Sequence, residues 1–386
     1  MRGGTRKGAG RKALKKSNKK KNRNVCMADD LYNKIMETKI EGIDNFSQKC
    51  QYLIKEGLKR YSVKKEDAEE MDSKLKFIDL FAGIGGIRKG FEDQDTVAVF
   101  SSEWDKYAAK TYKANYGDEP YGDITKIKEE DIPEHDVLLA GFPCQPFSNI
   151  GKREGFEHET QGTLFFDVLR ILRYHLPKMF LLENVTGLLT IQGGKTFQII
   201  LSELEKSGYN VFYDVLDAQN FGLPQRRKRV VIVGFRNDLG INSFAFPQGD
   251  IEHTVPIKSI LEHNPKGYTI SKHLQQSYLF KKDDGKPKLV DFNSDEVVGT
   301  LVASYHKIQR LTGTFVKDGE TGIRLFSELE CKRLMGFPDN FKVPVSRTQM
   351  YRQFGNSVAV PMMKAVADAM KEELAIAEDN MYVGAM

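Results

Sequence analysis

The chain has few cysteines and no long apolar run, and both absences narrow what it can be. Its four cysteines, Cys26, Cys50, Cys144 and Cys331, are far apart among 386 residues and form no C-x-x-C pair. This spacing argues against a zinc site and against a disulfide framework. No apolar run approaches the roughly twenty residues of a membrane span, and no apolar stretch follows the basic amino terminus as in a signal peptide. We therefore expect a cytoplasmic protein without a metal or a membrane anchor.

Acidic residues are missing from positions 1–24, which hold eleven Lys or Arg. The whole chain has a net charge of +5, so positions 25–386, with 47 basic and 53 acidic residues, carry −6. A Gly-, Lys- and Arg-rich arm of this kind is typically disordered alone and suits contacts that release counterions from DNA phosphates. A solubilising tail is the alternative.

One thiol stands in a loop of restricted shape. Residues 141–148 read Gly-Phe-Pro-Cys-Gln-Pro-Phe-Ser and follow the apolar run at 136–140. This order places Cys144 at the carboxyl end of a predicted strand, where open α/β sheets keep their chemistry. Pro143 and Pro146 fix the backbone on either side. Cys144 is therefore a candidate nucleophile, and a small core residue is the alternative.

A Gly-rich turn follows an earlier apolar strand at 76–88, read Lys-Phe-Ile-Asp-Leu-Phe-Ala-Gly-Ile-Gly-Gly-Ile-Arg. Gly83, Gly85 and Gly86 permit a tight turn and the close approach of a ligand. Glu103 follows the next predicted strand, where a carboxylate can accept hydrogen bonds from ribose hydroxyls. The pattern indicates a nucleoside pocket, or a turn without a ligand. A triphosphate loop is excluded because no Gly-Lys-Ser/Thr follows.

Two further strand-like segments bring charged groups to their ends. Residues 179–185 place Glu183 at the carboxyl end of one, and 225–229, read Gln-Arg-Arg-Lys-Arg, lead into another. In a strand, Gln225, Arg227 and Arg229 share one face. Taken singly, the Glu could cap a helix and the arginines could form surface ion pairs.

Strands and helices alternate from Leu75 to about Phe235. This order predicts an α/β fold with a doubly wound, mostly parallel sheet. Residues 240–300 are irregular, the regular pattern resumes after Val302, and 361–374 reads as an amphipathic helix.

Taken together, these segments resemble the DNA (cytosine-5)-methyltransferase family, and most closely the bacterial modification methylases of restriction systems. Phe-Gly-Asn-Ser-Val at 354–358 belongs to the same set of motifs, as does Arg-Asn-Asp-Leu at 236–239. The resemblance runs from about 74 to about 370 and is weakest at 240–298. It implies a Rossmann-like catalytic domain at 75–239 and 306–386, with an inserted target-recognition domain at 240–305. The implied activity is sequence-specific methylation of double-stranded DNA in a prokaryotic cell.

The resemblance also implies a mechanism. A methyl group would pass from S-adenosylmethionine to carbon 5 of a flipped-out cytosine. The thiolate of Cys144 would add to carbon 6, and Glu183 would donate a proton to ring nitrogen 3. Arg227 would hold the cytosine carbonyl oxygen, and Arg229 would position the thiol loop or Glu183.

Further residues are expected to bind the cofactor or DNA. For Trp104, simple core filling is the alternative. The expected cofactor residues are Phe81, Gly83, Gly85, Glu103, Trp104, Asp123, Ile124, Leu164, Asn356, Ser357 and Val358. The expected DNA-contacting residues are Gln145, Ser148, Gln225, Thr300 and Leu301.

The amino-terminal segment has a strand-helix-helix pattern at 22–62 and a charged linker at 63–74. Asp29 and Asp30 suit a helix start, Gly42 its end, and Asn45 can cap a second helix. The pattern resembles the ribbon-helix-helix repressors, which implies a homodimer through 25–62 that contacts DNA with Asn22 and Asn24. Such a module could repress the chain's own gene. A helical packing module is the alternative.

Three other functions share part of this pattern. An RNA methyltransferase of the same family, acting on tRNA, would share the motifs but is expected to lack the basic arm. A regulator with an inactive enzyme domain would lack a catalytic residue, and none is missing. A Rossmann oxidoreductase is disfavoured because hydride transfer needs no nucleophile.

Overall fold

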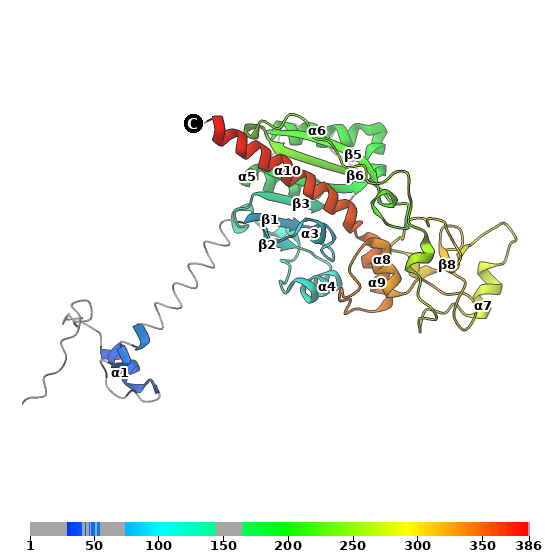
Figure 1. Cartoon of the computed structure of the whole chain (residues 1–386), viewed down its shortest axis with the longest axis horizontal. Coiled ribbons are helices and arrows are strands. Elements are labelled where there is room, and N and C mark those ends of the chain that lie inside the picture. Colours follow the sequence, from blue (N-terminus) through cyan, green and yellow to red (C-terminus); the bar gives the residue numbers. More distant parts are fainter. Residues whose placement is uncertain are drawn as a thin grey trace, which may run out of the picture. The chain divides into compact units, whose positions relative to one another are not determined.

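The chain divides into two compact units, Met1–Met71 and Asp72–Met386. The computed structural model describes residues 29–40, 43, 46, 48–50, 52–54, 74–143 and 164–384 (Figure 1). The predicted strand with Asn22 and Asn24 lies outside these residues, as do Cys144, Gln145 and Ser148.

The first unit contains α1 (Asp29–Glu37), which begins where the sequence predicts. The predicted end at Gly42 is wrong: the helix stops at Glu37, and the Thr38 hydroxyl donates to the Lys34 carbonyl at 2.7 Å. Helical backbone recurs at 46, 48–50 and 52–54. The rings of Tyr32 and Phe46 lie 4.5 Å apart, so this second helical stretch packs on α1.

The second unit is built on a six-stranded sheet in the order β2-β1-β3-β4-β6-β5. Its strands are β1 (Leu75–Leu80), β2 (Thr96–Ser102), β3 (Val137–Gly141), β4 (Met179–Val185), β5 (Tyr209–Asp217) and β6 (Lys228–Arg236). The first four are parallel, whereas β6 is antiparallel to both β4 and β5. The expectation of a mostly parallel sheet is confirmed, and β6 is the strand that runs against its neighbours. β6 follows β5 through a short connection, and antiparallel neighbours need no crossover.

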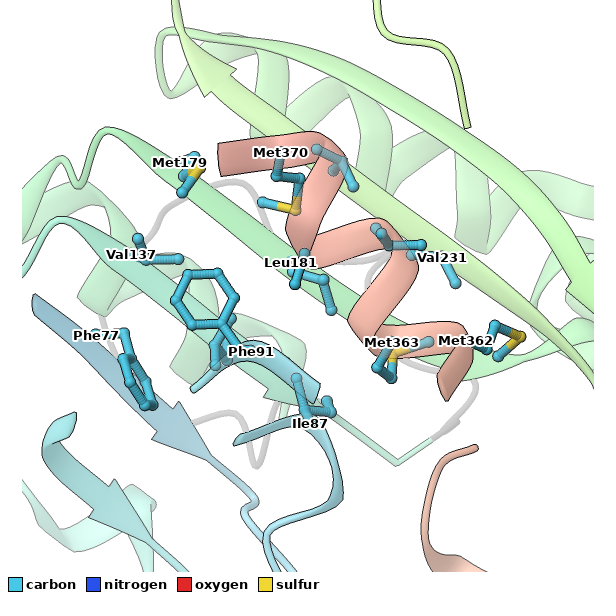
Figure 2. Close-up of a cluster of buried hydrophobic side chains, with 14 of the residues drawn as sticks. Phe77, Ile87, Phe91, Val137, Met179, Leu181, Val231, Met362, Met363 and Met370 are labelled. Carbon is cyan, nitrogen blue, oxygen red and sulfur yellow. The ribbon is translucent and has the colours of Figure 1, made fainter. Parts of the chain in front are cut away.

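Helices cover both faces of this sheet, because successive strand residues point to opposite sides. On one face, Phe77, Leu181 and Val231 pack against Ile87 of α3 and Met363 of α10 (Figure 2). On the other face lie α5 and α6. The helices of this lobe are α3 (Gly86–Phe91), α4 (Lys106–Tyr116), α5 (Phe165–His175), α6 (Lys195–Lys206) and α10 (Val360–Gly384). The amphipathic helix predicted at 361–374 is thus the first part of the longer α10, which packs back onto the sheet.

A smaller lobe follows the sheet, and its core also takes in Ile84, Ala108 and Val360 of the larger lobe. It contains β7 (Lys288–Val290), β8 (Thr314–Val316), α7 (Lys272–Leu274), α8 (Glu328–Met335) and α9 (Arg347–Asn356). Its core joins Ile257 and Val290 to Phe315, Leu334 and Phe354. The lobe therefore extends well past residue 305, where the sequence placed its end, because β7 pairs with β8 across that boundary.

Short helical turns connect these elements. Their bounds are Ile124–Lys126, Glu129–Asp131, Thr186–Leu189, Ile191–Gly194, Ala218–Phe221, Asn237–Leu239, Ile257–Ile260, Gln275–Leu279 and Tyr305–Lys307. Within the described ranges, no helix is long and apolar enough to cross a membrane. Nor do three or more His, Cys, Asp or Glu residues gather there in a way that could hold a metal ion.

Candidate active site and cofactor pocket

A cavity of about 280 Å³ lies at the carboxyl ends of β1 and β2. Its walls include six of the expected cofactor residues, together with three that the sequence did not single out. The lining residues are Phe81, Ser102, Glu103, Trp104, Gly122, Asp123, Ile124, Thr125 and Leu164. Ser102 could have been found from its place beside Glu103 at the end of a strand; Gly122 and Thr125 flank Asp123.

Glu103 ties the Gly-rich turn to the end of β2. Its Oε2 accepts the backbone N–H of Gly83 at 2.7 Å, and its Oε1 accepts that of Asp105 at 2.7 Å. Burial raises the pKa of Glu103, against the lowering effect of these two amides. Each carboxylate oxygen keeps a lone pair for a further donor in the cavity.

The glycines of the turn are required by close packing. Gly85 has φ +80°, and a Cβ there would lie 2.3 Å from the ring of Tyr116, whose hydroxyl donates to the Gly85 carbonyl at 2.7 Å. A Cβ on Gly86 would lie 2.6 Å from Ser357 Oγ and 2.9 Å from Val358. Gly83, Gly85 and residues 356–358 do not line the cavity. They form the turn and its support.

Trp104 is 78% exposed although it is large and apolar. This exposure excludes core filling, and the ring lies at the cavity wall. Asp123 also lines the cavity, and its Oδ1 accepts the Thr125 hydroxyl at 2.8 Å. That hydrogen bond lowers the pKa of Asp123, so it stays a carboxylate that can accept from a ligand.

Glu183 lies beside the start of the thiol loop. It is opposite Gly141 in the β3–β4 register, and a Cβ on Gly141 would lie 3.7 Å from Glu183 Oε2. Gly141 precedes Cys144 by three residues. The Asn184 side-chain amide donates to the Phe142 carbonyl at 2.8 Å and so holds the chain where the loop begins. Asn184 was not among the site residues expected from the sequence, although it follows Glu183 directly.

A buried ion pair joins Glu183 to Arg229. Arg229 Nε lies 2.8 Å from Glu183 Oε1, and the two side chains are 13% and 11% exposed. Burial raises the pKa of Glu183, while Arg229 and Arg227 act to lower it. The balance favours a carboxyl group that can hold a proton, as a general acid must.

The alternation predicted along 225–229 is confirmed: Gln225 and Arg227 are buried, whereas Arg226 and Lys228 are exposed. The role expected for Arg227 does not fit this burial. Its guanidinium is 1% exposed and donates to the carbonyls of Leu301, Gly355 and Ser357. Burial and the nearby charge of Arg229 lower the pKa of Arg227 to about 9. A group enclosed by backbone carbonyls cannot also hold a substrate carbonyl.

Gln225 and Leu301 likewise do not face DNA, contrary to expectation. Gln225 is fully buried, donating to the Leu334 carbonyl at 2.9 Å and accepting the Leu301 amide at 2.6 Å. Leu301 is 3% exposed. Thr300 is partly exposed, and its hydroxyl donates to the Arg226 carbonyl at 2.8 Å.

Cys331 offers no competing nucleophile. It is buried, and burial raises the pKa of its thiol well above the usual range. Reactive cysteines instead have lowered pKa values and access to solvent.

The chain is similar to known proteins over most of its length. The chain is 66% identical over 404 residues to Type II methyltransferase M.BsuFI of Bacillus subtilis, covering 98% of each protein. It is 56% identical over 303 residues to Type II methyltransferase M.MspI of Moraxella sp, covering 78% of this chain and 72% of that protein. The crystal structure of S. pombe Dnmt2 methyltransferase matches 78% of this chain and 99% of its own, with a TM-score of 0.62. At 20% identity, that match concerns the fold alone.

The sheet and the match to close relatives point to the same conclusion as the motifs. The family described as C-5 cytosine-specific DNA methylase matches residues 75–372, which is most of the chain. The chain is thus an enzyme that methylates cytosine in DNA, and it belongs to the C-5 cytosine-specific DNA methylase family.

Proposed function

We propose that the chain transfers a methyl group from S-adenosylmethionine to carbon 5 of a cytosine within a specific duplex sequence. It would thereby protect DNA as the modification enzyme of a Type II restriction system in the bacterial cytoplasm. The observation that carries this proposal is the buried Glu183–Arg229 pair, 2.8 Å apart, beside the start of the loop that holds Cys144. The names of the two relatives support the restriction-system role.

The cavity suits S-adenosylmethionine by its chemistry. The exposed Trp104 ring offers a stacking surface for adenine, Glu103 an acceptor for the ribose hydroxyls, and Asp123 an acceptor for the adenine amino group. The buried hydroxyl of Ser102, which lines the cavity, has no hydrogen-bond partner among the described groups of the protein. A bound polar ligand would satisfy such groups. When bound, this cofactor supplies the electrophilic methyl group that carbon 5 accepts.

The protein's own groups would activate the cytosine. The Cys144 thiolate adds to carbon 6, and the electron pair of the 5,6 double bond moves toward ring nitrogen 3, where Glu183 donates its proton. After carbon 5 has accepted the methyl group, nitrogen 3 returns its proton to the Glu183 carboxylate. The carbon 5 proton then passes to water, the 5,6 double bond forms again, and the thiolate leaves carbon 6. Burial raises the pKa of Glu183, which favours the proton-carrying form that this step uses.

We assign the charge beside the cytosine to Arg229 and not to Arg227. Arg229 keeps 13% of its side chain exposed, against 1% for Arg227, and is bonded to Glu183, so it can hold the acid in place and face the base carbonyl. The target cytosine must flip out of the duplex to reach these groups, because the faces of a stacked base are covered by its neighbours. Thr300 and the smaller lobe would contact the DNA around it.

The test is a methylation assay with a defined readout. The purified chain is incubated with tritiated S-adenosylmethionine and either genomic DNA or tRNA, and the DNA is then sequenced after bisulfite treatment. We expect label in DNA only, at one short sequence. Cys144→Ser should abolish turnover but keep DNA binding, because a hydroxyl ionises far less readily than a thiol. Label in tRNA alone, or turnover by the Ser variant, would contradict the proposal.

For the amino-terminal unit, we propose a homodimeric DNA-binding module that uses Asn22 and Asn24 and represses the chain's own promoter. The eleven Lys or Arg of the arm at 1–24 support contact with DNA phosphates. Deleting residues 1–72 should leave methylation in vitro nearly unchanged and remove a footprint on the promoter. A monomeric module without a footprint at moderate salt would refute the repressor role.

A further inference from the structure

Arg227 joins two segments that lie far apart in the sequence. Its Nη1 donates to the Leu301 carbonyl at 3.1 Å, and its Nη2 donates to the carbonyls of Gly355, at 3.0 Å, and Ser357. Leu301 lies in the segment that leaves the smaller lobe's irregular part. Gly355 and Ser357 lie where α9 passes into α10.

Arg227 is itself held firmly to the large sheet. Its backbone N–H donates to Asp217 Oδ1 at 2.9 Å, and its carbonyl accepts the Ala218 amide at 3.1 Å. Because Asp217 ends β5, the guanidinium is a fixed fork that projects from the sheet toward both segments. Its planar donors suit several carbonyls at once, which a flexible ammonium group does not.

The two segments also touch one another. A Cβ on Gly355 would lie 2.1 Å from the Ala303 nitrogen, so only glycine fits at this crossing. On the other side, Ser357 and Val358 press on Gly86 of the Gly-rich turn. Residues 301–303, residues 355–358 and the turn therefore form one continuous series of contacts, with Arg227 bonded to its first two parts.

A short ladder adds to this connection. The Arg226 amide donates to the Val298 carbonyl at 2.9 Å, and the Val298 amide donates to the Pro224 carbonyl at 3.0 Å. Gln225 accepts the Leu301 amide at 2.6 Å. The stretch 298–301 is thus bound along its length to 224–227, and a shift of the smaller lobe must move against these bonds.

We propose that Arg227 is a positioning residue that couples the cofactor pocket to the placement of the DNA-recognising lobe. The inference rests on the proposed function. A ligand that orders the Gly-rich turn and residues 355–358 also orders residues 301–303, because the Arg227 guanidinium is bonded to both segments. Cofactor and DNA should therefore strengthen one another's binding by the same factor, as linkage requires.

The experiment measures this coupling factor in the full-length chain. Trp104, the only tryptophan, lies at the pocket, so its fluorescence reports S-adenosylhomocysteine binding directly. The dissociation constant is measured with and without a duplex that the chain methylates. We expect the duplex to tighten binding by about 5-fold or more in the wild type. In Arg227→Lys the ratio should fall to within twofold of one, because lysine cannot span the three carbonyls.

Arg324→Lys is the matched control. Arg324 is also fully buried and forked, but its partners are Glu330, Asp318 and the carbonyls of Glu262 and Leu325, within the smaller lobe. This variant should keep the wild-type ratio even if it melts earlier. A ratio retained by Arg227→Lys, or lost equally in both variants, would overturn the positioning role.

A wild-type measurement covers the case in which Arg227→Lys does not fold. S-adenosylhomocysteine should slow amide hydrogen exchange at 298–303 as well as at 355–358, because the first stretch is tied to the second. Protection confined to 355–358 would refute the coupling. A wild-type chain that binds no S-adenosylhomocysteine would instead remove the proposed cofactor site, on which the coupling depends.

Discussion

Replacing Glu183 with glutamine separates its chemistry from its packing. Glutamine keeps the shape and can still accept the Arg229 Nε–H, which lies 2.8 Å from Oε1 in the wild type. It cannot supply a proton. If Glu183 is the general acid, the rate of methyl transfer should fall by about two to four orders of magnitude, equivalent to about 3–5 kcal/mol of barrier. Loss of the charge from a buried hydrogen bond should cost only about 1–3 kcal/mol of stability.

The variant Arg229→Met tests the direction in which the pKa of Glu183 moves when its ion-pair partner is removed. Arg229 lowers the pKa of Glu183, while burial raises it. Removing Arg229 therefore raises this pKa further, and the carboxyl group stays protonated to higher pH. The alkaline limb of the pH–rate profile, which reports loss of the acid's proton, should move to higher pH in Arg229→Met and be absent in Glu183→Gln.

Single-turnover transfer of tritiated methyl to a target duplex, measured across pH, checks both variants. S-adenosylhomocysteine affinity serves as the control and should change little, since Glu183 does not line the cofactor cavity. A Glu183→Gln rate within a few-fold of wild type would show that the carboxyl is not the acid. A limb that moves to lower pH in Arg229→Met would refute the electrostatic reasoning.

Three further predictions follow from packing, exposure and charge. Gly85→Ala and Gly117→Ala both place alanine at φ near +80°, but only the Cβ at position 85 meets other atoms, 2.3 Å from Tyr116. Thermal melts should show a loss of stability of about 1–2 kcal/mol for Gly117→Ala and a further loss of about 1–3 kcal/mol for Gly85→Ala. Equal losses in the two variants would contradict the packing. Trp104→Ala should weaken S-adenosylhomocysteine binding by about 1–3 kcal/mol in calorimetry, whereas Trp104→Phe should keep most of it; no change would show that adenine does not stack there. Burial lowers the pKa of His135 from 6.5 to about 4. The fold therefore has its full stability from this neutral ring above pH 6.5 and should lose about 3 kcal/mol of unfolding free energy as pH falls to 4. Urea melts of His135→Phe should show a flatter pH dependence, and an unchanged slope would exclude His135 as the cause of the acid sensitivity.

The amino-acid sequence determined the local features because they depend on near neighbours. The alternation of apolar runs with helices predicted the strands of the sheet, and the glycine pattern predicted the tight turn after β1. The apolar run that ends at Glu183 placed that carboxyl at the end of a strand. Period-two alternation along 225–229 also separated the buried Gln225 and Arg227 from the exposed Arg226 and Lys228. The resemblance of the motifs named the family that the comparisons then showed.

Only the tertiary structure could separate Arg227 from Arg229. The two share one face of a strand, so local pattern treats them alike. Arg227 is enclosed by carbonyls that come 74 to 130 residues later in the chain, whereas Arg229 meets Glu183 across the neighbouring strand. The same distant segments bury Gln225 and Leu301, and the pairing of β7 with β8 carries the smaller lobe past residue 305. Burial at these positions depends on which distant segments of the backbone pack against them, and no short sequence pattern encodes that packing.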